Sequence, residues 1–271
     1  MNSRKKKWLY AVVISCSIAI CLFGIQTSMR QKQQKKVTYA KLAMKQEAEK
    51  IKNFSASLDS FYKQDRPDFL IDTLELSSIS EMEQQVRLLK VTVSDYDLTQ
   101  GDFSENQELE RDKKKLLDKI EEVKMKQTIL QSVTSLVNHL PVDWSANLEG
   151  IVVKEETTLA DIHLLQQSVV NQTSLWHQAV AAVLATMELQ IIHYENVKAQ
   201  IDEMLVDDHL TDKATNDAWL LSYNQLTFIK NEQLHAQLAG KLAIIEAQLL
   251  GYQTAADETP APNEAGEAYD E

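Results

Sequence analysis

The sequence predicts an all-α protein: an N-terminal transmembrane helix, then an elongated antiparallel helical bundle or coiled coil, then a disordered acidic C-terminal tail. The 271 residues include only six glycines and four prolines, too few for turn-rich β folds or glycine-loop nucleotide folds. Apolar residues recur at steps of three and four over long stretches, which is the period of a helix. Residues 1–36 carry eight basic and no acidic side chains, whereas residues 37–271 carry 20 basic and 40 acidic ones.

The N-terminal segment is expected to anchor the chain in a membrane. Residues 1–7 form a short basic tail, and Trp8–Ile25 is an uncharged run of 18 residues. As a helix it would span about 27 Å, close to the roughly 30 Å of a hydrocarbon core. A second basic segment follows at residues 26–36, with four basic residues on each side of the run. Because the first cluster directly precedes the run on a very short tail, we expect this tail in the cytoplasm and the main domain outside it.

Two other interpretations of this segment remain open. Val13–Cys16 resembles a bacterial lipobox, in which Cys16 would be lipidated and become the mature N-terminus. The run could also be an ordinary cleaved signal peptide. Cys16 and Cys21 are the two cysteines, and both lie inside the run. The main domain therefore has no disulfide framework, cysteine-based zinc site or cysteine nucleophile.

Residues 37–254 are predicted to form the helical bundle domain. The first helix, continuing from the membrane run to Lys63, has an apolar stripe with one polar interruption, at Val37, Ala40, Met44, Glu47, Ile51, Phe54, Leu58 and Phe61. Pro67 is expected to open a second helix near residues 67–92, because proline is favoured in a first helical turn. After a loop at 94–104, Ser104 and Gln107 match a capping box. The third helix should then run to Pro141.

Two more helices are expected after a connector at residues 141–156. Thr158 and Asp161 repeat the capping pattern, and a long helix should run from there to Val206. Asp207–His209 breaks the pattern, and Thr211 is expected to cap a last helix that ends near Tyr252 and exposes Ser222. Residues 255–271 contain six acids and no base, which predicts a disordered tail.

The sequence contains no recognisable catalytic motif. It has no nucleophile elbow, phosphate-binding loop, dinucleotide fingerprint or zinc-protease helix. We therefore expect no enzyme, and we assign no catalytic, cofactor-binding or metal-binding residues and no cofactor. The nearest approach to a metal motif is the Glu-x-x-His spacing of Glu232 and His235, which carboxylate-bridged two-metal bundles use in two copies. The nearest second copy, Gln190 with His193, has glutamine in place of glutamate, and glutamine is a poor metal ligand there. The loop that begins at Asp95 lacks the glycine and glutamate of an EF-hand, with Gln100 and Asn106 at those positions.

His163, His177 and His193 are expected to be ordinary surface or boundary residues, and the tryptophans are expected to be anchors of the core or its boundary. His163, His177 and His193 fall on different faces of one predicted helix, so they would not converge on a site. Trp144, Trp176 and Trp219 are predicted to anchor the core or its boundary.

The plan of a basic start, one span and a cysteine-free acidic helical domain resembles exported envelope proteins of Gram-positive bacteria, such as helical cell-wall-binding lipoproteins and bitopic division proteins. This architectural resemblance implies no functional residues. We expect a non-enzymatic, single-pass membrane protein that presents an extracytoplasmic bundle as a cell-envelope scaffold or adaptor. The alternatives are a ligand-sensing bundle that signals through a membrane partner, and a cytoplasmic-facing organiser of division or secretion.

The expected partners follow from the same features. Trp8–Ile25 would contact the lipid bilayer, and helix faces would bind a protein partner or a second copy. A cell-wall polymer is a further candidate. Lys113–Lys115 is the one basic run of the domain and could contribute to such a contact. We expect no nucleic-acid partner, because the acidic balance argues against non-specific binding, in which clustered lysine and arginine neutralise phosphates.

Overall fold

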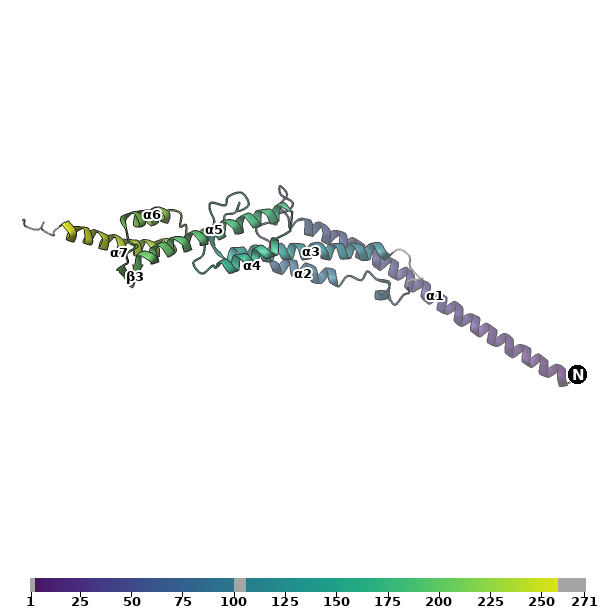
Figure 1. The fold of residues 1–271 in the computed structure, drawn as a ribbon. Helices are drawn as coiled ribbons and strands as arrows, with labels where there is room; N and C mark the ends of the chain where they lie inside the picture. Colours follow the sequence, from purple (N-terminus) through teal and green to yellow (C-terminus); the bar gives the residue numbers. More distant parts are fainter. Residues whose placement is uncertain (1–2, 100–105, 258–271) are drawn as a thin grey trace, which may run out of the picture. The chain divides into compact units, whose positions relative to one another are not determined.

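The computed structural model describes the backbone of residues 3–99 and 106–257 and the side chains of residues 26–99 and 107–251. The chain is mostly helical, at 69%, with seven α-helices and four short strands among the described residues (Figure 1). Predominantly helical structure is therefore confirmed. The chain divides into two compact units, residues 1–127 (unit 1) and residues 128–271 (unit 2).

The first helix, α1, extends from Ser3 to Asp59, 57 residues without a break. The expected continuation of the helix from the apolar run into the main domain is confirmed for the backbone. The side chains of Trp8–Ile25, on which the transmembrane prediction and the Cys16 alternative depend, lie outside the described residues. The Ser104 cap and residues 258–271 of the predicted tail also lie outside them, whereas residues 255–257 belong to the last helix, which ends at Asp257 and not near Tyr252.

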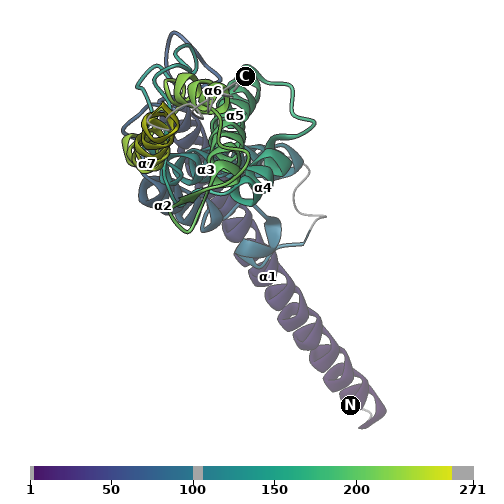
Figure 2. The ribbon, with the colours of Figure 1, turned by 60° about the vertical axis from the view of Figure 1, so that its left-hand side comes forward.

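Among the described residues, the helix α5 (Leu175–Met204) is long and apolar enough to cross a membrane by length and composition. Ten of its side chains are buried. It contacts α4 (Leu159–Val169), α6 (Asn216–Leu226) and α7 (Glu232–Asp257) (Figure 2). The core helix of a folded domain satisfies the same criterion.

Unit 1 buries the apolar stripe of α1 in its own core. Ala40, Met44, Ile51 and Leu58 are buried. The main cluster joins α1, α2 (Leu76–Arg87) and α3 (Asn106–Ser135), through Ile51, Leu58, Ile79, Met82, Val86, Leu116, Ile120 and Val123. A smaller cluster joins Ala40 to Val93 of the short 3-10 helix η1 (Val93–Tyr96). The apolar stripe of α1 is thus buried against other segments of the same chain.

The prediction that Pro67 opens a helix is wrong. An antiparallel bridge joins Tyr62 to Leu70, and the N–H of Phe69 donates to the carbonyl of Arg66 at 2.9 Å. Pro67 thus occupies the second position of a β-turn, which needs the same φ as a first helical turn. The turn is favoured because it buries Phe69, Leu70 and Leu74.

Side chains from α3 hold this turn in place. Lys126 is buried, and its Nζ donates to the carbonyl of Asp68 at 3.1 Å and lies 2.8 Å from Glu122 Oε1. The same ammonium lies 5.3 Å from the ring centre of Tyr62. Burial, with a smaller contribution from the Glu122 carboxylate, raises the pKa of Tyr62 to about 12. The charged head of Lys126 therefore has partners although its stem is enclosed.

Glu83 links α2 to α3 by an ion-pair network. Its carboxylate lies 2.8 Å from Lys124 Nζ and 2.6 Å from the Arg87 guanidinium. The hydrogen bond from Lys124, and then that from Arg87, lowers the pKa of Glu83 below its ordinary value. A carboxyl group with a lowered pKa stabilises the fold while it is ionised.

Replacing Glu83 with glutamine is expected to lower stability at neutral pH and to have no effect in acid. The Glu83 contribution is complete above about pH 5 and is lost as the pH falls through the lowered folded-state pKa, below about pH 4. Thermal unfolding followed by circular dichroism across this range measures it. Glu81→Gln, at an exposed position of the same helix, is the control. An equal Tm deficit for E83Q at about pH 3 and about pH 7 would contradict the prediction.

Unit 2 contains, after the last turns of α3, a short two-stranded sheet that the sequence pattern does not predict. The third helix ends at Ser135 and does not reach Pro141. Strand β1 (Val137–His139) follows and pairs antiparallel with β2 (Val152–Val153), which lies within the predicted connector. The paired side chains of Val137 and Val153 are both buried. Burial of this valine pair explains why the chain leaves the helix before the proline.

The capping box at Thr158 is confirmed. Thr158 Oγ1 accepts from the Asp161 N–H at 3.3 Å, and Asp161 Oδ2 accepts from the Thr158 N–H at 3.0 Å. The single long helix predicted after it is wrong, because α4 ends at Val169 and α5 begins at Leu175. Between them Asn171 has φ of 67°, a left-handed conformation that asparagine tolerates. Ser174 then caps α5.

The last predicted helix is also two helices. Thr215, not Thr211, caps α6 by accepting from the Ala218 N–H at 3.1 Å, and Asn231 caps α7. The Thr211 hydroxyl donates instead to the carbonyl of Glu203, beside a hairpin of β3 (Leu205–Val206) and β4 (His209–Leu210). The breaks between α4 and α5 and between α6 and α7 were not predicted, because the helical pattern of apolar residues continues through them.

The β3–β4 turn is made by Asp207 and Asp208, with φ of 48° and 59°. Two left-handed central residues define the type I′ turn, which prefers glycine at the second of them. Asp208→Gly is therefore expected to raise the free energy of unfolding by up to about 1 kcal/mol. Urea unfolding measures it, with Asp212→Gly as the control, since Asp212 is outside the left-handed region. A stability loss in D208G equal to that in D212G would contradict the prediction.

Candidate functional site

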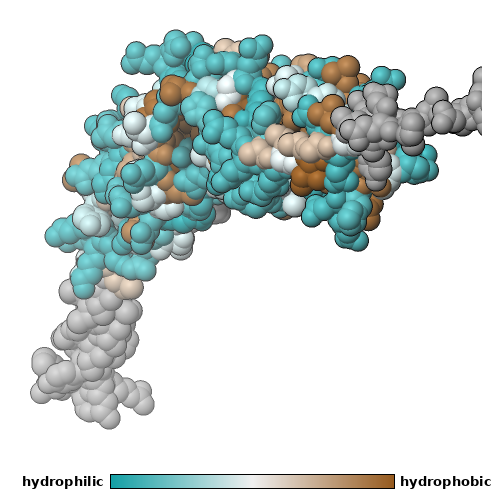
Figure 3. All heavy atoms as spheres, turned by 90° about the vertical axis from the view of Figure 1, so that its left-hand side faces the viewer, coloured by the Kyte–Doolittle hydropathy of each residue, from teal (hydrophilic) through white to brown (hydrophobic). Residues whose placement is uncertain are grey.

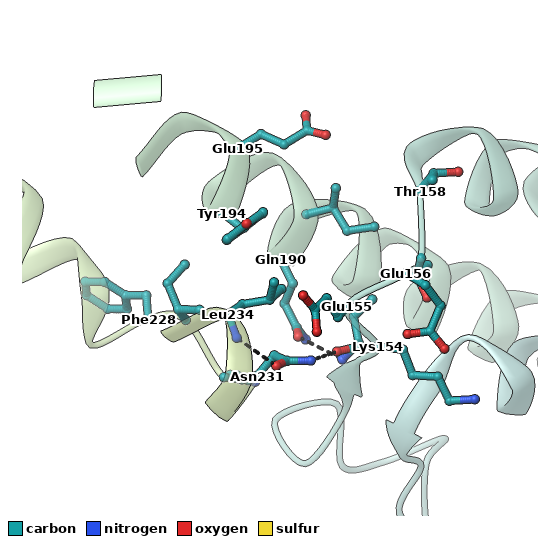
Figure 4. A pocket seen from close by; sticks show the side chains of 15 residues that line it. Lys154, Glu155, Glu156, Thr158, Gln190, Tyr194, Glu195, Phe228, Asn231 and Leu234 are labelled. Carbon is teal, nitrogen blue, oxygen red and sulfur yellow. Dashed lines mark hydrogen bonds between the residues drawn. The ribbon is translucent and has the colours of Figure 1, made fainter. Parts of the chain in front are cut away.

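Unit 2 contains a cavity of about 240 Å³ formed by three separate segments. Residues 153–158 form one side, α5 forms the second, and residues 228–234 around the α6–α7 turn form the third (Figure 4). Its apolar surface comes from Val153, Ile191, Tyr194, Phe228, Ile229 and Leu234. Phe228 is 68% exposed at the rim, and its ring meets that of His193 edge-on at 5.8 Å.

Two amide side chains fix the wall of the cavity at β2. Gln190 Nε2 donates to the carbonyl of Ile151 at 2.9 Å, and the Val153 N–H donates to Gln190 Oε1 at 3.4 Å. Asn231 Nδ2 donates to the carbonyl of Val153 at 2.8 Å (Figure 4). The strand edge that β1 leaves unpaired is thus covered by side chains, so its polar groups are satisfied without a third strand.

Asn231 also begins α7. Its Oδ1 accepts from the N–H groups of Gln233 and Leu234, at 3.0 and 3.1 Å, while the side chain is 4% exposed. One buried amide therefore joins the start of a helix to a strand that is 78 residues away in sequence.

The cavity is lined by three carboxylates and two lysines. Glu155 Oε1 accepts from Gln237 Nε2 at 2.6 Å. Within the described residues, Glu156 and Glu195 form no ion pair. Both lysines bind backbone carbonyls, Lys154 that of Ser135 and Lys230 that of Glu149, each at 2.7 Å.

Unit 2 as a whole is strongly acidic. Residues 128–271 contain 21 acidic and five basic residues, against 19 and 23 in residues 1–127. Hydrophilic side chains predominate on the face drawn in Figure 3, and hydrophobic ones form separate patches between them. Two of the five lysines, Lys198 and Lys241, bind Asp202 and lower its pKa. The cavity therefore lies in the unit whose formal net charge is −16, whereas that of residues 1–127 is +4.

The structure does not bring the three histidines considered in the sequence analysis together at one site. His163 contacts Glu188 at 3.1 Å, and His193 forms a hydrogen bond with the carbonyl of Gln225. His177 was expected at the surface or boundary but is buried, with its Nδ1 2.8 Å from the hydroxyl of Ser174, which caps α5. Within the described ranges, no three or more His, Cys, Asp or Glu side chains form a group that could hold a metal ion.

The prediction for the tryptophans is confirmed. Trp144 and Trp176 are buried. Trp219 is half-buried, donates its Nε1–H to the carbonyl of Leu242 at 3.0 Å and stacks on Tyr223. These contacts are those of core and boundary anchors.

Comparison with known proteins found no match to the chain among protein families, curated proteins or solved structures.

Proposed function

We propose that the protein is a non-enzymatic, single-pass membrane protein of the cell envelope, whose helical body forms an elongated antiparallel bundle and serves as an extracytoplasmic scaffold or adaptor. The continuity of α1 carries this proposal. Trp8–Ile25 and the stripe that enters the core of unit 1 belong to one helix. From Ile25 to Ala40, the first buried residue of the stripe, this helix extends about 22 Å at 1.5 Å per residue. It would hold the body at a set distance from the bilayer.

The segment between the apolar run and unit 1 is suited to lie beside a lipid bilayer, on either side of it. Residues 26–36 are exposed, and their charged side chains are all basic. Cationic side chains directly beside a span are attracted by anionic lipid headgroups, by about 1 kcal/mol each near the surface. This segment would therefore lie at the headgroup level.

Single-cysteine labelling tests the membrane orientation. Ser222, which the sequence pattern places on an exposed face, is 1% exposed and donates to Gln200 Oε1, so it is unsuitable. Ser78 on α2 is exposed. In a chain with Cys16→Ala and Cys21→Ala, Ser78→Cys is expected to react with an impermeant maleimide on intact cells. Labelling only after lysis would overturn the extracytoplasmic orientation and favour the cytoplasmic organiser.

Extraction at alkaline pH tests the anchor itself. A membrane-spanning chain stays in the membrane pellet, and the Cys16→Ala variant is expected to stay there as well. Release of the unaltered chain would exclude a span. Release of the Cys16→Ala variant alone would show that a lipid on Cys16 is the anchor.

A further inference from the structure

We infer that the cavity of unit 2 binds a basic side chain, lysine or arginine, presented by an extended segment of a partner protein. This inference rests on the proposed adaptor function and specifies the chemistry of the partner.

The size and lining of the cavity favour one long side chain. A volume of about 240 Å³ is below the roughly 300–1,000 Å³ of pockets that enclose drug-sized molecules. Ile191 and Ile229 line the cavity and are buried, which suits the methylene stem of a lysine or arginine. Tyr194 and Phe228 also line the cavity, and the faces of aromatic rings attract cations.

The charges at the cavity favour a cation. Glu156 and Glu195 line it without an ion pair among the described residues. The ammonium groups of Lys154 and Lys230 bind carbonyls of residues outside the lining, and in Figure 4 Lys154 extends away from Gln190 and Asn231. The acidic excess of unit 2 would also raise the local concentration of basic segments.

The opposite ligand, an anion, is disfavoured although two helices begin at the cavity. A helix N-terminus carries a partial charge of about +0.5, and both α4 and α7 start there. Each first turn already contains a carboxylate, Asp161 in α4 and Glu232 in α7. Their first N–H groups are capped by Thr158 and Asn231.

The acidic C-terminal tail of the same chain is excluded as the occupant. Residues 255–271 carry six acidic and no basic side chains, so the carboxylates of the cavity would repel them. The tail therefore does not supply the basic side chain.

Fluorescence anisotropy with labelled decapeptides tests the inference on the full chain in detergent at about 0.15 M salt. The probe alternates serine with lysine, and its controls replace every lysine by glutamine or by glutamate. We expect the lysine peptide to bind and the two controls not to bind. The double variant Glu156→Gln/Glu195→Gln should weaken binding by about tenfold without changing the circular dichroism spectrum.

A matched variant separates the cavity from general attraction by an acidic protein. Asp212→Asn/Glu246→Gln removes the same charge from exposed positions outside the cavity and should weaken binding by less than about threefold. Equal weakening by both double variants, preference for the glutamate peptide, or no binding of the lysine peptide would each overturn the inference. Because peptide binding does not depend on membrane orientation, such a failure is distinct from a failure of the labelling experiment.

Discussion

Trp176→Ala is expected to lower the free energy of unfolding by about 3–5 kcal/mol, the usual cost of removing a large buried aromatic side chain. Trp176 has the largest volume among the fully buried side chains and is 1% exposed. It lies in the first turn of α5, with its ring edge-on to that of His177 at 4.9 Å. Alanine would leave a cavity that the surrounding helices can fill only in part.

Urea unfolding followed by circular dichroism measures this loss. Leu189→Ala provides the control on the same helix, because Leu189 is 67% exposed and its truncation should cost less than about 0.5 kcal/mol. A loss below about 1 kcal/mol in W176A would show that α5 does not depend on this side chain.

Asn231→Ala is expected to cost about 2–4 kcal/mol, because one amide has two separate roles. Loss of the acceptor that caps α7 costs about 1 kcal/mol. Loss of the donor leaves the buried carbonyl of Val153 without this partner, which costs about 1–3 kcal/mol more. The variant should also bind the lysine decapeptide less tightly, since the wall of the cavity at β2 is no longer held from α7.

Two further variants separate these roles. Asn231→Ser keeps a hydroxyl that can cap α7 but cannot reach Val153, so its stability should lie between those of the unaltered chain and N231A. Thr215→Ala removes a cap of the same kind from α6, away from the cavity, and should cost about 1 kcal/mol. If N231A cost no more than T215A, the bond to Val153 would contribute nothing.

Helix content and helix starts were predictable from the sequence where a local signal sufficed. The Thr158–Asp161 box is such a signal, because both partners lie within one turn. Pro67 did not show whether a helix or a β-turn follows, because the first turn of a helix and a β-turn require the same φ at proline. Burial of Phe69 and Leu70 favours the β-turn. The strands β3 and β4 have two residues each, too few to show an alternating pattern.

The cavity could not be predicted, because its three walls are distant in sequence and meet only in the folded unit. Asn231, followed by Glu232 and an apolar helix, does resemble a helix start, but the apolar spacing on either side of it favoured one continuous helix. Gln190 gives no signal at all, since its role depends on β2, which was not predicted. The charge difference between units 1 and 2 emerges only once the boundary at residue 127 is known.

The burial of the α1 stripe limits how the protein can form assemblies. Ile51 and Leu58 already pack against α2 and α3, so the seam that a two-stranded coiled coil would use is occupied. Pairing of two copies through residues 40–58 would require each copy to open unit 1 first. Such pairing competes with folding, so a stable homodimer must use another surface or exchange whole helices between copies.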